Sequence, residues 1–135
     1  MNNGRFATAL HILTLLAKQD PALLSSEYIA GSININPVLV RKELSSLRNH
    51  GLIQSKEGKN GGSTLAKPAN KIRLSEIYNA VRQSPLLGRS NEPNPACPVG
   101  KQINRHLEDL YSEAEENLIR KLGTQTLADF SQRFS

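Results

Sequence analysis

The stretch 25–66 constrains the fold of this 135-residue chain more than any other. It reads SSEYIAGSININPVLVRKELSSLRNHGLIQSKEGKNGGSTLA, in which two short helical segments flank a turn and a glycine-rich, lysine-bearing segment follows. Helix, turn, helix and hairpin in this order are typical of a winged helix-turn-helix. The sequence therefore predicts a mainly α-helical fold with a two-stranded wing.

An amphipathic helix is expected before this stretch, over residues 4–18. Apolar residues from Phe6 to Ala17 recur at helical spacing, and Asp20-Pro21 ends the pattern. This apolar run is too short and too interrupted to span a bilayer, so no membrane segment is expected. His11 is interpreted as a hydrogen-bonded histidine at the edge of the core, because no second metal ligand stands at helical spacing.

Ser25 and Ser26 are candidate N-caps of a second helix that ends near residue 32. Asn36-Pro37 then supplies a capping side chain and a first-turn proline, which together start a third helix over residues 37–49. The residues of the second helix expected to face the core are Tyr28, Ile29 and Ala30. The buried face of the third helix is expected to hold Val40, Leu44 and Leu47.

Burial of that face leaves a polar and cationic surface on the third helix. Arg41 is the predicted base reader, because a guanidinium can pair bidentately with guanine, whereas Lys42 and Arg48 suit phosphates. An ordinary amphipathic helix with a solvated charged face would look the same, so the third helix alone leaves both interpretations open. The residues predicted to contact DNA from the two helices are Ser26, Asn36, Pro37, Val38, Arg41, Lys42, Ser45 and Arg48.

A hairpin after the third helix favours the DNA interpretation. Gly51 can end the helix, and three glycines, Gly58, Gly61 and Gly62, permit a tight turn between two short strands. Phosphate or minor-groove contacts are predicted for Lys56, Lys59 and Asn60. A nucleotide-binding loop is rejected, because GKNGGST lacks the spacing G-x-x-x-x-G-K-[ST].

The run 44–66, LSSLRNHGLIQSKEGKNGGSTLA, resembles the Rrf-two family of regulators, which includes iron-sulfur and nitric-oxide sensing repressors. The resemblance covers nearly the whole chain. It implies a bacterial, cytoplasmic, homodimeric transcription factor, usually a repressor, that binds a double-stranded DNA operator and pairs its subunits through a long helix near the C-terminus.

Three positions depart from the family pattern. Arg41 stands where family members commonly have a glutamate, so a different operator is expected, since glutamate accepts from cytosine and arginine donates to guanine. Glu57 stands where the wing often carries an arginine, which leaves Lys56 or Lys59 to make the wing contact. Ser63 replaces an aromatic residue after the double glycine.

The chain is expected to divide into a DNA-binding domain over 1–84, a proline-rich linker over 85–97 and a dimerisation segment over 98–135. The last helix of the first domain is expected from about Ser75, with Ile77, Tyr78 and Val81 packing inward, and Pro85 is expected to end it. The final segment is expected to close with a short helix near residues 126–130, after a glycine cap at Gly123.

Cys97 is the single cysteine of the chain, which favours a reducing cytosol. A single thiolate cannot hold an iron-sulfur cluster within one chain, and neither His50 nor His106 supplies the missing ligands at a recognisable spacing, so no cluster is expected. No other metal or cofactor is expected either. Two roles stay open for Cys97. Its place before Pro98, at the start of the long helix, suits redox sensing by sulfenylation or an intersubunit disulfide. Alternatively, it packs as a small apolar residue.

The helix predicted over 98–122 carries an apolar stripe at steps of three or four residues. A lone helix of this length needs a partner surface, and a symmetric dimer would supply one and place two recognition helices about 34 Å apart. Packing against its own chain is the alternative. The predicted interface residues are Val99, Ile103, Leu107, Leu110, Ala114, Leu118 and Leu122.

The distribution of charge also favours a polyanionic partner for the N-terminal part. Residues 1–90 contain 12 Lys and Arg against 5 Asp and Glu, whereas residues 91–135 contain 5 against 7. A sequence-specific DNA-binding regulator is thus the favoured function, and a winged-helix module that binds another regulator or an enzyme is the alternative. No catalytic constellation is evident, so an enzyme is not expected.

Overall fold

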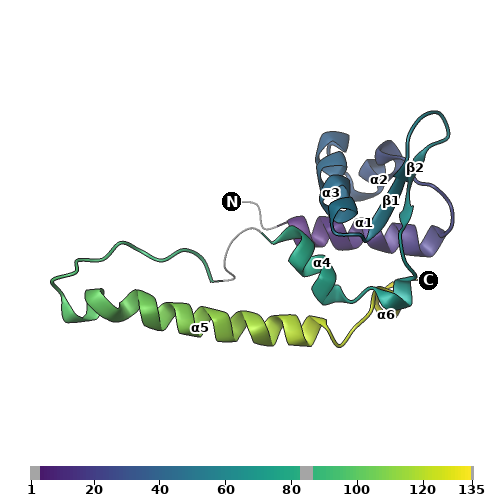
Figure 1. Cartoon of the computed structure of the whole chain (residues 1–135). Helices are drawn as coiled ribbons and strands as arrows, with labels where there is room; N and C mark the ends of the chain where they lie inside the picture. The colour runs from purple at the N-terminus through teal and green to yellow at the C-terminus, as the bar shows by residue number, and fades with distance from the viewer. Residues whose placement is uncertain (1–3, 83–86, 135) are drawn as a thin grey trace.

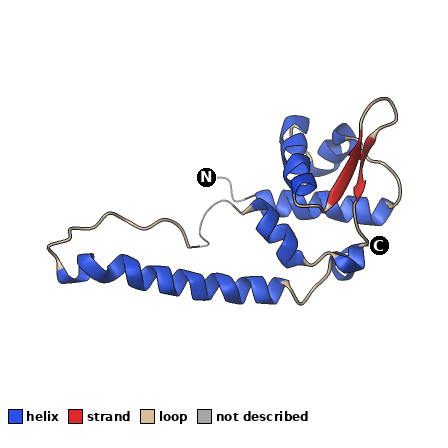
Figure 2. Ribbon diagram, in the orientation of Figure 1, coloured by secondary structure: helices blue, strands red, loops and turns tan. Residues whose placement is uncertain are grey.

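The fold is taken from a computed structural model that describes residues 4–82 and 87–134 (Figures 1 and 2). The described residues form six α-helices, one short 3-10 helix and a two-stranded antiparallel sheet, which confirms the predicted mainly helical fold with a wing. The elements are α1 (Arg5–Gln19), α2 (Ser26–Ile33), α3 (Pro37–Asn49), β1 (Ile53–Lys56), β2 (Gly62–Leu65), η1 (Ala69–Lys71), α4 (Leu74–Val81), α5 (Pro98–Leu122) and α6 (Leu127–Ser131).

Side-chain caps fix where the first two helices of the motif begin. The Ser25 hydroxyl accepts from the backbone N–H of Tyr28 at 3.1 Å, and Asn36 Oδ1 accepts from that of Val38 at 2.8 Å. Pro37 occupies the first turn of α3, where no intrahelical donor is needed. The turn that the sequence predicted between α2 and α3 is therefore present, with its predicted cap.

Helix α3 ends in a Schellman-type turn. Gly51 has a φ of +74°, and its N–H donates to the carbonyl of Arg48, while the N–H of Leu52 donates to the carbonyl of Leu47. The chain then enters β1 with Leu52 and Ile53 buried. The glycine thus turns the chain directly from α3 into the wing.

The wing is joined to the chain segment that precedes α2. Strand β1 pairs with β2 in the register Ile53↔Leu65 to Lys56↔Gly62, and Leu24 and Ser63 exchange two backbone hydrogen bonds of 3.0 and 2.9 Å. A Cβ at Gly62 would lie 2.7 Å from the carbonyl oxygen of Leu24, so glycine permits this close approach. The base of the wing is therefore held on two sides.

Helix α1 lies at the centre of the hydrophobic core. Ile12, Leu13 and Leu16 are fully buried among α2, α3, α4 and the sheet. Leu127 of α6 is also fully buried, because the C-terminal helix folds back against α1 and η1 (Figure 1). The core therefore contains residues from both ends of the chain.

An ion pair lies at the edge of this core. The guanidinium of Arg5 in α1 contacts the carboxylate of Glu43 in α3 through two bonds of 2.7 and 2.8 Å, with Glu43 buried. The bond to Glu43 raises the pKa of Arg5 above its usual value. This ion pair connects α1 to α3, and its two residues are 38 positions apart in the sequence.

Two details differ from the sequence prediction. Tyr28 was expected in the core but is exposed, because Ile29 and Ala30 occupy the buried face of α2 and the Tyr28 hydroxyl instead accepts from Gln19 at 2.7 Å. The fourth helix begins at Leu74 and ends at Val81, with Tyr78 only partly buried. Pro85, its predicted terminator, lies outside the described residues.

Helix α5 has the predicted bounds and extends away from the other helices, with the loop that precedes it running alongside (Figure 1). None of its 25 residues is buried. Its connection to α4 is made by Glu115, which accepts from Tyr78 at 3.1 Å and contacts Arg82 at 2.6 Å. Burial and this hydrogen bond raise the pKa of Tyr78.

Among the described residues, no helix combines the length and the apolar character that a membrane crossing requires.

Candidate nucleic-acid interface

The outward face of α3 is the centre of the candidate site. The predicted core residues Val40, Leu44 and Leu47 are buried, which turns the opposite face to solvent. There Val38 is 60% exposed, and Arg41, Lys42 and Arg48 are also exposed. An apolar group beside three cations suits a DNA major groove, where thymine methyls, guanine acceptors and phosphates lie close together.

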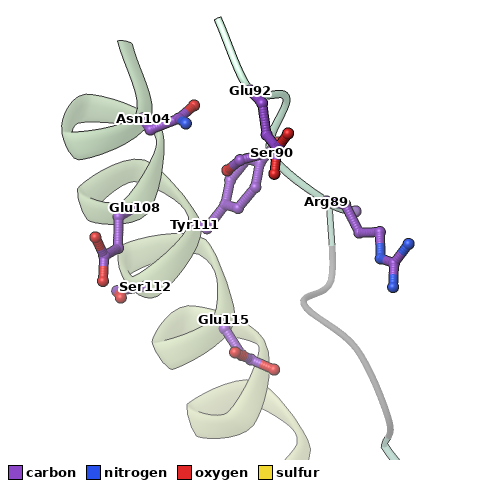
Figure 3. Close-up of a pocket in the computed structure, with 9 residues that line it drawn as sticks. Arg89, Ser90, Glu92, Asn104, Glu108, Tyr111, Ser112 and Glu115 are labelled. Atoms are coloured by element: carbon purple, nitrogen blue, oxygen red, sulfur yellow. The ribbon is translucent and has the colours of Figure 1, made fainter. Parts of the chain in front are cut away.

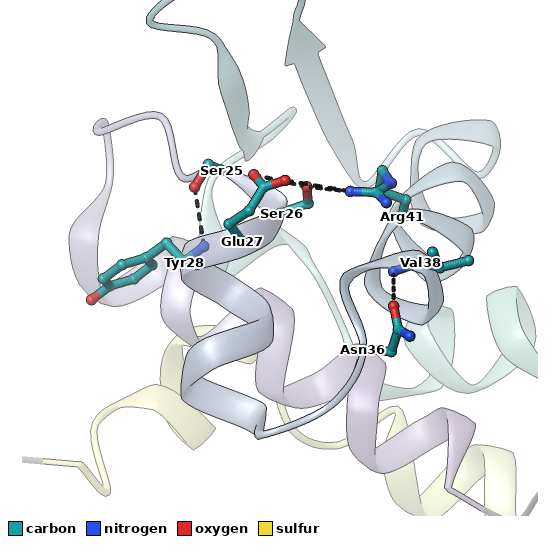
Figure 4. A network of polar contacts seen from close by, with 7 residues as sticks. All are labelled: Ser25, Ser26, Glu27, Tyr28, Asn36, Val38 and Arg41. Carbon is teal, nitrogen blue, oxygen red and sulfur yellow. Dashed lines mark hydrogen bonds and ion pairs between the residues drawn. The ribbon is translucent and has the colours of Figure 1, made fainter.

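Arg41 is held by residues at the start of α2 (Figure 4). Its Nη1 donates to the Ser26 hydroxyl at 3.3 Å and to Glu27 Oε2 at 3.5 Å. Ser26 in turn donates to Glu27 Oε1 at 3.4 Å. The structure thus brings two predicted residues, Ser26 and Arg41, together around a carboxylate that the sequence reading did not single out.

The other predicted residues of the motif are less available. The Oδ1 atom of Asn36 is used as the α3 cap, while Pro37 and Ser45 are only half-exposed. These three residues lie beside the outward face of α3, and its charged groups are supplied by Arg41, Lys42 and Arg48. Lys42 is exposed and makes no side-chain bond within the described chain, so its ammonium is available for a phosphate.

Arg48 connects α3 to the wing. Its Nη1 donates to the Ser55 hydroxyl at 3.2 Å, and Ser55 shares a hydrogen bond of 3.1 Å with Ser63. Ser63 is buried and bonded to Ser55, so a small polar residue fits this position. The recognition helix and the wing are therefore linked by side chains as well as by Gly51.

The wing tip carries the remaining predicted contacts. Lys56, Lys59 and Asn60 are all exposed, and Asn60 has a φ of +67° in the tight turn. Glu57 is exposed beside them. The tip therefore presents two cations and one carboxylate, and its net attraction for phosphates is that of a single positive charge.

Other cations near the base of the hairpin are occupied within the chain. Lys67 contacts Glu76 at 2.7 Å, and Arg73 donates to the carbonyl of Gly123 at 2.7 Å. Burial alone would raise the pKa of Glu76, but the Arg73 backbone N–H and the Lys67 ammonium lower it overall. These residues connect the wing base, α4 and the end of α5, and they do not extend the candidate DNA-binding surface of α3.

Comparison with known proteins identifies the group to which this fold belongs. A family model described as Rrf2, iron-dependent transcriptional regulator, matches residues 2–133. The chain belongs to the Rrf2 family. It is 38% identical over 130 residues to YwnA of Bacillus subtilis, which is named among the HTH-type transcriptional regulators, and the match covers 96% of each chain.

Two solved structures share the fold. A crystal structure assigned to a DNA-binding protein is 34% identical, with a TM-score of 0.75 over 93% of this chain and 97% of that one. CymR (YrzC), the global cysteine regulator of Bacillus subtilis, is 22% identical, with a TM-score of 0.73 over 100% and 98%. The chain is therefore a transcriptional regulator of the Rrf2 family, a class of regulators rather than enzymes.

The iron in the family description does not fit the donor set of this chain. The sequence has one cysteine, Cys97, and within residues 4–82 and 87–134 no three His, Cys, Asp or Glu side chains are grouped to hold a metal ion. Cys97 is exposed and immediately precedes α5. A sulfur-ligated cluster held by this chain is thus inconsistent with its residues.

A cavity of about 740 Å³ lies between α5 and the segment 88–92 (Figure 3). Tyr111 points from α5 toward the segment that carries Ser90 and Glu92 (Figure 3). Its lining residues are Gly88, Arg89, Ser90, Glu92, Asn104, Glu108, Tyr111, Ser112 and Glu115. Cys97 is absent from this lining, so the cavity and the thiol are separate features.

Proposed function

We propose that this Rrf2 regulator is a homodimeric, sequence-specific repressor that reads a double-stranded DNA operator in the cytoplasm. The observation that carries the proposal is the outward face of α3, where Val38 and Arg41 are exposed next to the wing. Arg41 reads a guanine, Val38 contacts a thymine methyl, and Lys42 binds a phosphate. The exposed cations Lys56 and Lys59 of the wing add phosphate or minor-groove contacts.

Helix α5 supports the homodimer. Ile103 is 38% exposed and Leu110 56% exposed in the single chain, although both belong to an apolar stripe. Pairing two copies of α5 removes this stripe from water, which is favourable at about 25 cal/mol per Å² of apolar surface. The predicted interface residues Val99, Leu107, Ala114 and Leu118 extend the same surface, while Leu122 at its end packs against the core.

DNA binding tests the proposal. Selection from a random-sequence duplex library with the full chain is expected to recover one preferred, two-fold symmetric duplex. Affinity for that duplex is expected to fall steeply with salt, because each phosphate contact contributes a slope of about −0.9 in log K against log salt. Weak, salt-insensitive binding without a preferred sequence would instead favour a protein-binding module.

Arg41→Ala tests the assignment of the base reader. Losing a bidentate arginine–guanine contact is expected to reduce discrimination at one base pair of each half-site by about 1–3 kcal/mol. Lys42→Ala is the matched control, because loss of a phosphate contact weakens all sequences alike and lowers the salt slope. An unchanged sequence preference for Arg41→Ala would show that another residue reads this base.

Redox control through Cys97 is the second part of the proposal. The thiol is exposed at the start of α5, so oxidants can reach it, and each subunit of the proposed dimer supplies one. Oxidation to a sulfenic acid, or to an intersubunit disulfide, would alter the segment that leads into the dimer helix. This would change the spacing of the two recognition helices.

Cys97→Ser separates sensing from DNA binding. The variant is expected to bind the selected duplex like the native chain but to stay bound when hydrogen peroxide is added. Release of native protein by peroxide should be reversed by dithiothreitol. Equal release of the serine variant would contradict a sensing role and leave Cys97 as a structural residue.

A further inference from the structure

We propose that Glu27 is a specificity-determining residue that holds Arg41 for base reading and disfavours its contact with phosphates. This inference rests on the proposed DNA-reading function and adds a residue from α2 to the recognition surface. Glu27 lies in the first turn of α2, while Arg41 lies one turn into α3. The two are 14 positions apart and meet only because the motif folds.

The geometry leaves Arg41 both held and accessible. Its Nη1 lies 3.3 Å from the Ser26 hydroxyl and 3.5 Å from Glu27 Oε2 (Figure 4). The Arg41 side chain is 53% exposed, and a guanidinium has five donors, so its contacts with Ser26 and Glu27 leave donors for a base edge. A carboxylate that binds one side of the guanidinium therefore orients its other side.

Glu27 has little effect on stability in the free protein. Its side chain is 72% exposed, and such exposed ion pairs typically contribute about 0–1 kcal/mol. The pair becomes more important when DNA excludes water from the surface, because electrostatic interactions strengthen as the local dielectric falls. A carboxylate at that surface repels every phosphate, whereas it favours the arginine that pairs with guanine.

The pairing distinguishes Arg41 from the other cations of the surface. Among the residues described, Arg48 is bonded to Ser55, and Lys42 has no side-chain partner. Of the predicted DNA-contacting cations, Arg41 is the one with a carboxylate within 4 Å in the described chain. A cation restrained in this way contributes sequence preference, whereas Lys42 contributes general affinity.

Glu27→Gln tests the inference, with Glu116→Gln as a control. Glu116 is an exposed carboxylate on α5, so its substitution changes the net charge equally. The probes are the duplex recovered by the native chain and a scrambled duplex of the same length and composition. Glu27→Gln is expected to bind the scrambled duplex about threefold to fivefold more tightly, with a salt slope steeper by about one unit.

Discrimination between the two duplexes is expected to fall by a similar factor for Glu27→Gln and to stay unchanged for Glu116→Gln. Arg41→Ala supplies the coupling test, because in that background Glu27→Gln should cause no further loss of discrimination. Thermal unfolding by circular dichroism confirms that each variant is folded.

Either of two results would overturn the inference about Glu27 without affecting the proposed function. One is a Glu27→Gln protein that changes affinity for both duplexes by the factor seen with Glu116→Gln. The other is an unchanged effect of Glu27→Gln in the Arg41→Ala background. A native protein that recovers no preferred duplex would instead overturn the proposed function, and the inference with it.

Discussion

Helices α3 and α5 are both amphipathic, but only α3 has its apolar face covered within the chain. Val40, Leu44 and Leu47 of α3 are buried, whereas α5, almost twice as long, has no buried residue. This difference is the reason for proposing a DNA ligand for the charged face of α3 and a second copy of the chain for the apolar face of α5.

The largest expected effect is on the free energy of unfolding, and it comes from the buried face of α3. Leu47→Ala is expected to lower the free energy of unfolding by about 2–5 kcal/mol, because the Leu47 side chain is fully buried and its truncation leaves a cavity in the core. Leu110→Ala is the matched substitution on α5. It should leave the unfolding of dilute, dissociated chains unchanged while weakening the dimer, as measured by urea denaturation over a range of protein concentrations.

A concentration-independent loss of stability in Leu110→Ala would contradict the comparison. It would mean that Leu110 packs within its own chain.

Disruption of the α5 stripe is expected to act mainly on operator affinity. The double variant Ile103→Glu, Leu110→Glu places two charges on the proposed interface and should sediment as a monomer. Its affinity for the selected duplex should fall by about a hundredfold or more, because two linked half-site contacts become independent. A glutamate-bearing protein that still sediments as a dimer would assign subunit pairing to another surface.

The smallest expected effect lies at the junction between the two regions. Glu76 accepts from the Arg73 N–H at 2.8 Å and from Lys67, and its pKa in the folded state is lowered. A lowered folded pKa means that this stabilisation is present above the unfolded value near 4.5 and is lost as pH falls through the folded pKa. Glu76→Gln should therefore be less stable at pH 7 by about 0.5–1 kcal/mol.

Thermal melts at pH 7 and in acid check this prediction. The difference between native protein and Glu76→Gln should shrink as the carboxyl becomes protonated. Glu57→Gln, which removes an exposed carboxylate of the wing, is the control for the change in net charge. A gap of constant size across the acid range would assign the effect of Glu76 to packing rather than to its charge.

Local patterns in the sequence were sufficient for most element boundaries. Ser25, Asn36 and Pro37 act within a few residues of themselves, so their caps could be predicted, and Gly51 ends α3 where its spacing indicated. Pro98, Gly123 and the apolar period between them likewise predicted both ends of α5. These features depend on neighbours along the chain, which a sequence displays directly.

Contacts between distant segments could not be predicted in this way. Arg5 and Glu43 are 38 positions apart, and the surface pair Glu27–Arg41 depends on how α2 crosses α3. Glu43 did carry a weak signal, since it lies three residues after Val40 and thus near the buried face. Tyr28 was misplaced because an eight-residue helix offers too few turns to define its buried side.

The two backbone hydrogen bonds between Leu24 and Ser63 have a consequence for the length of the DNA site that the protein can bind. Arg48 is bonded to Ser55 on one side of the wing base, and the Leu24 backbone is bonded to Ser63 on the other, so these bonds restrain the wing base relative to α3. In the proposed complex, the protein would therefore set the distance along the duplex between the base pairs that α3 reads and the phosphates that the wing contacts. Each half-site should therefore have a fixed length. Inserting one base pair within a half-site should abolish binding, because a wing restrained in this way does not shift to compensate for it.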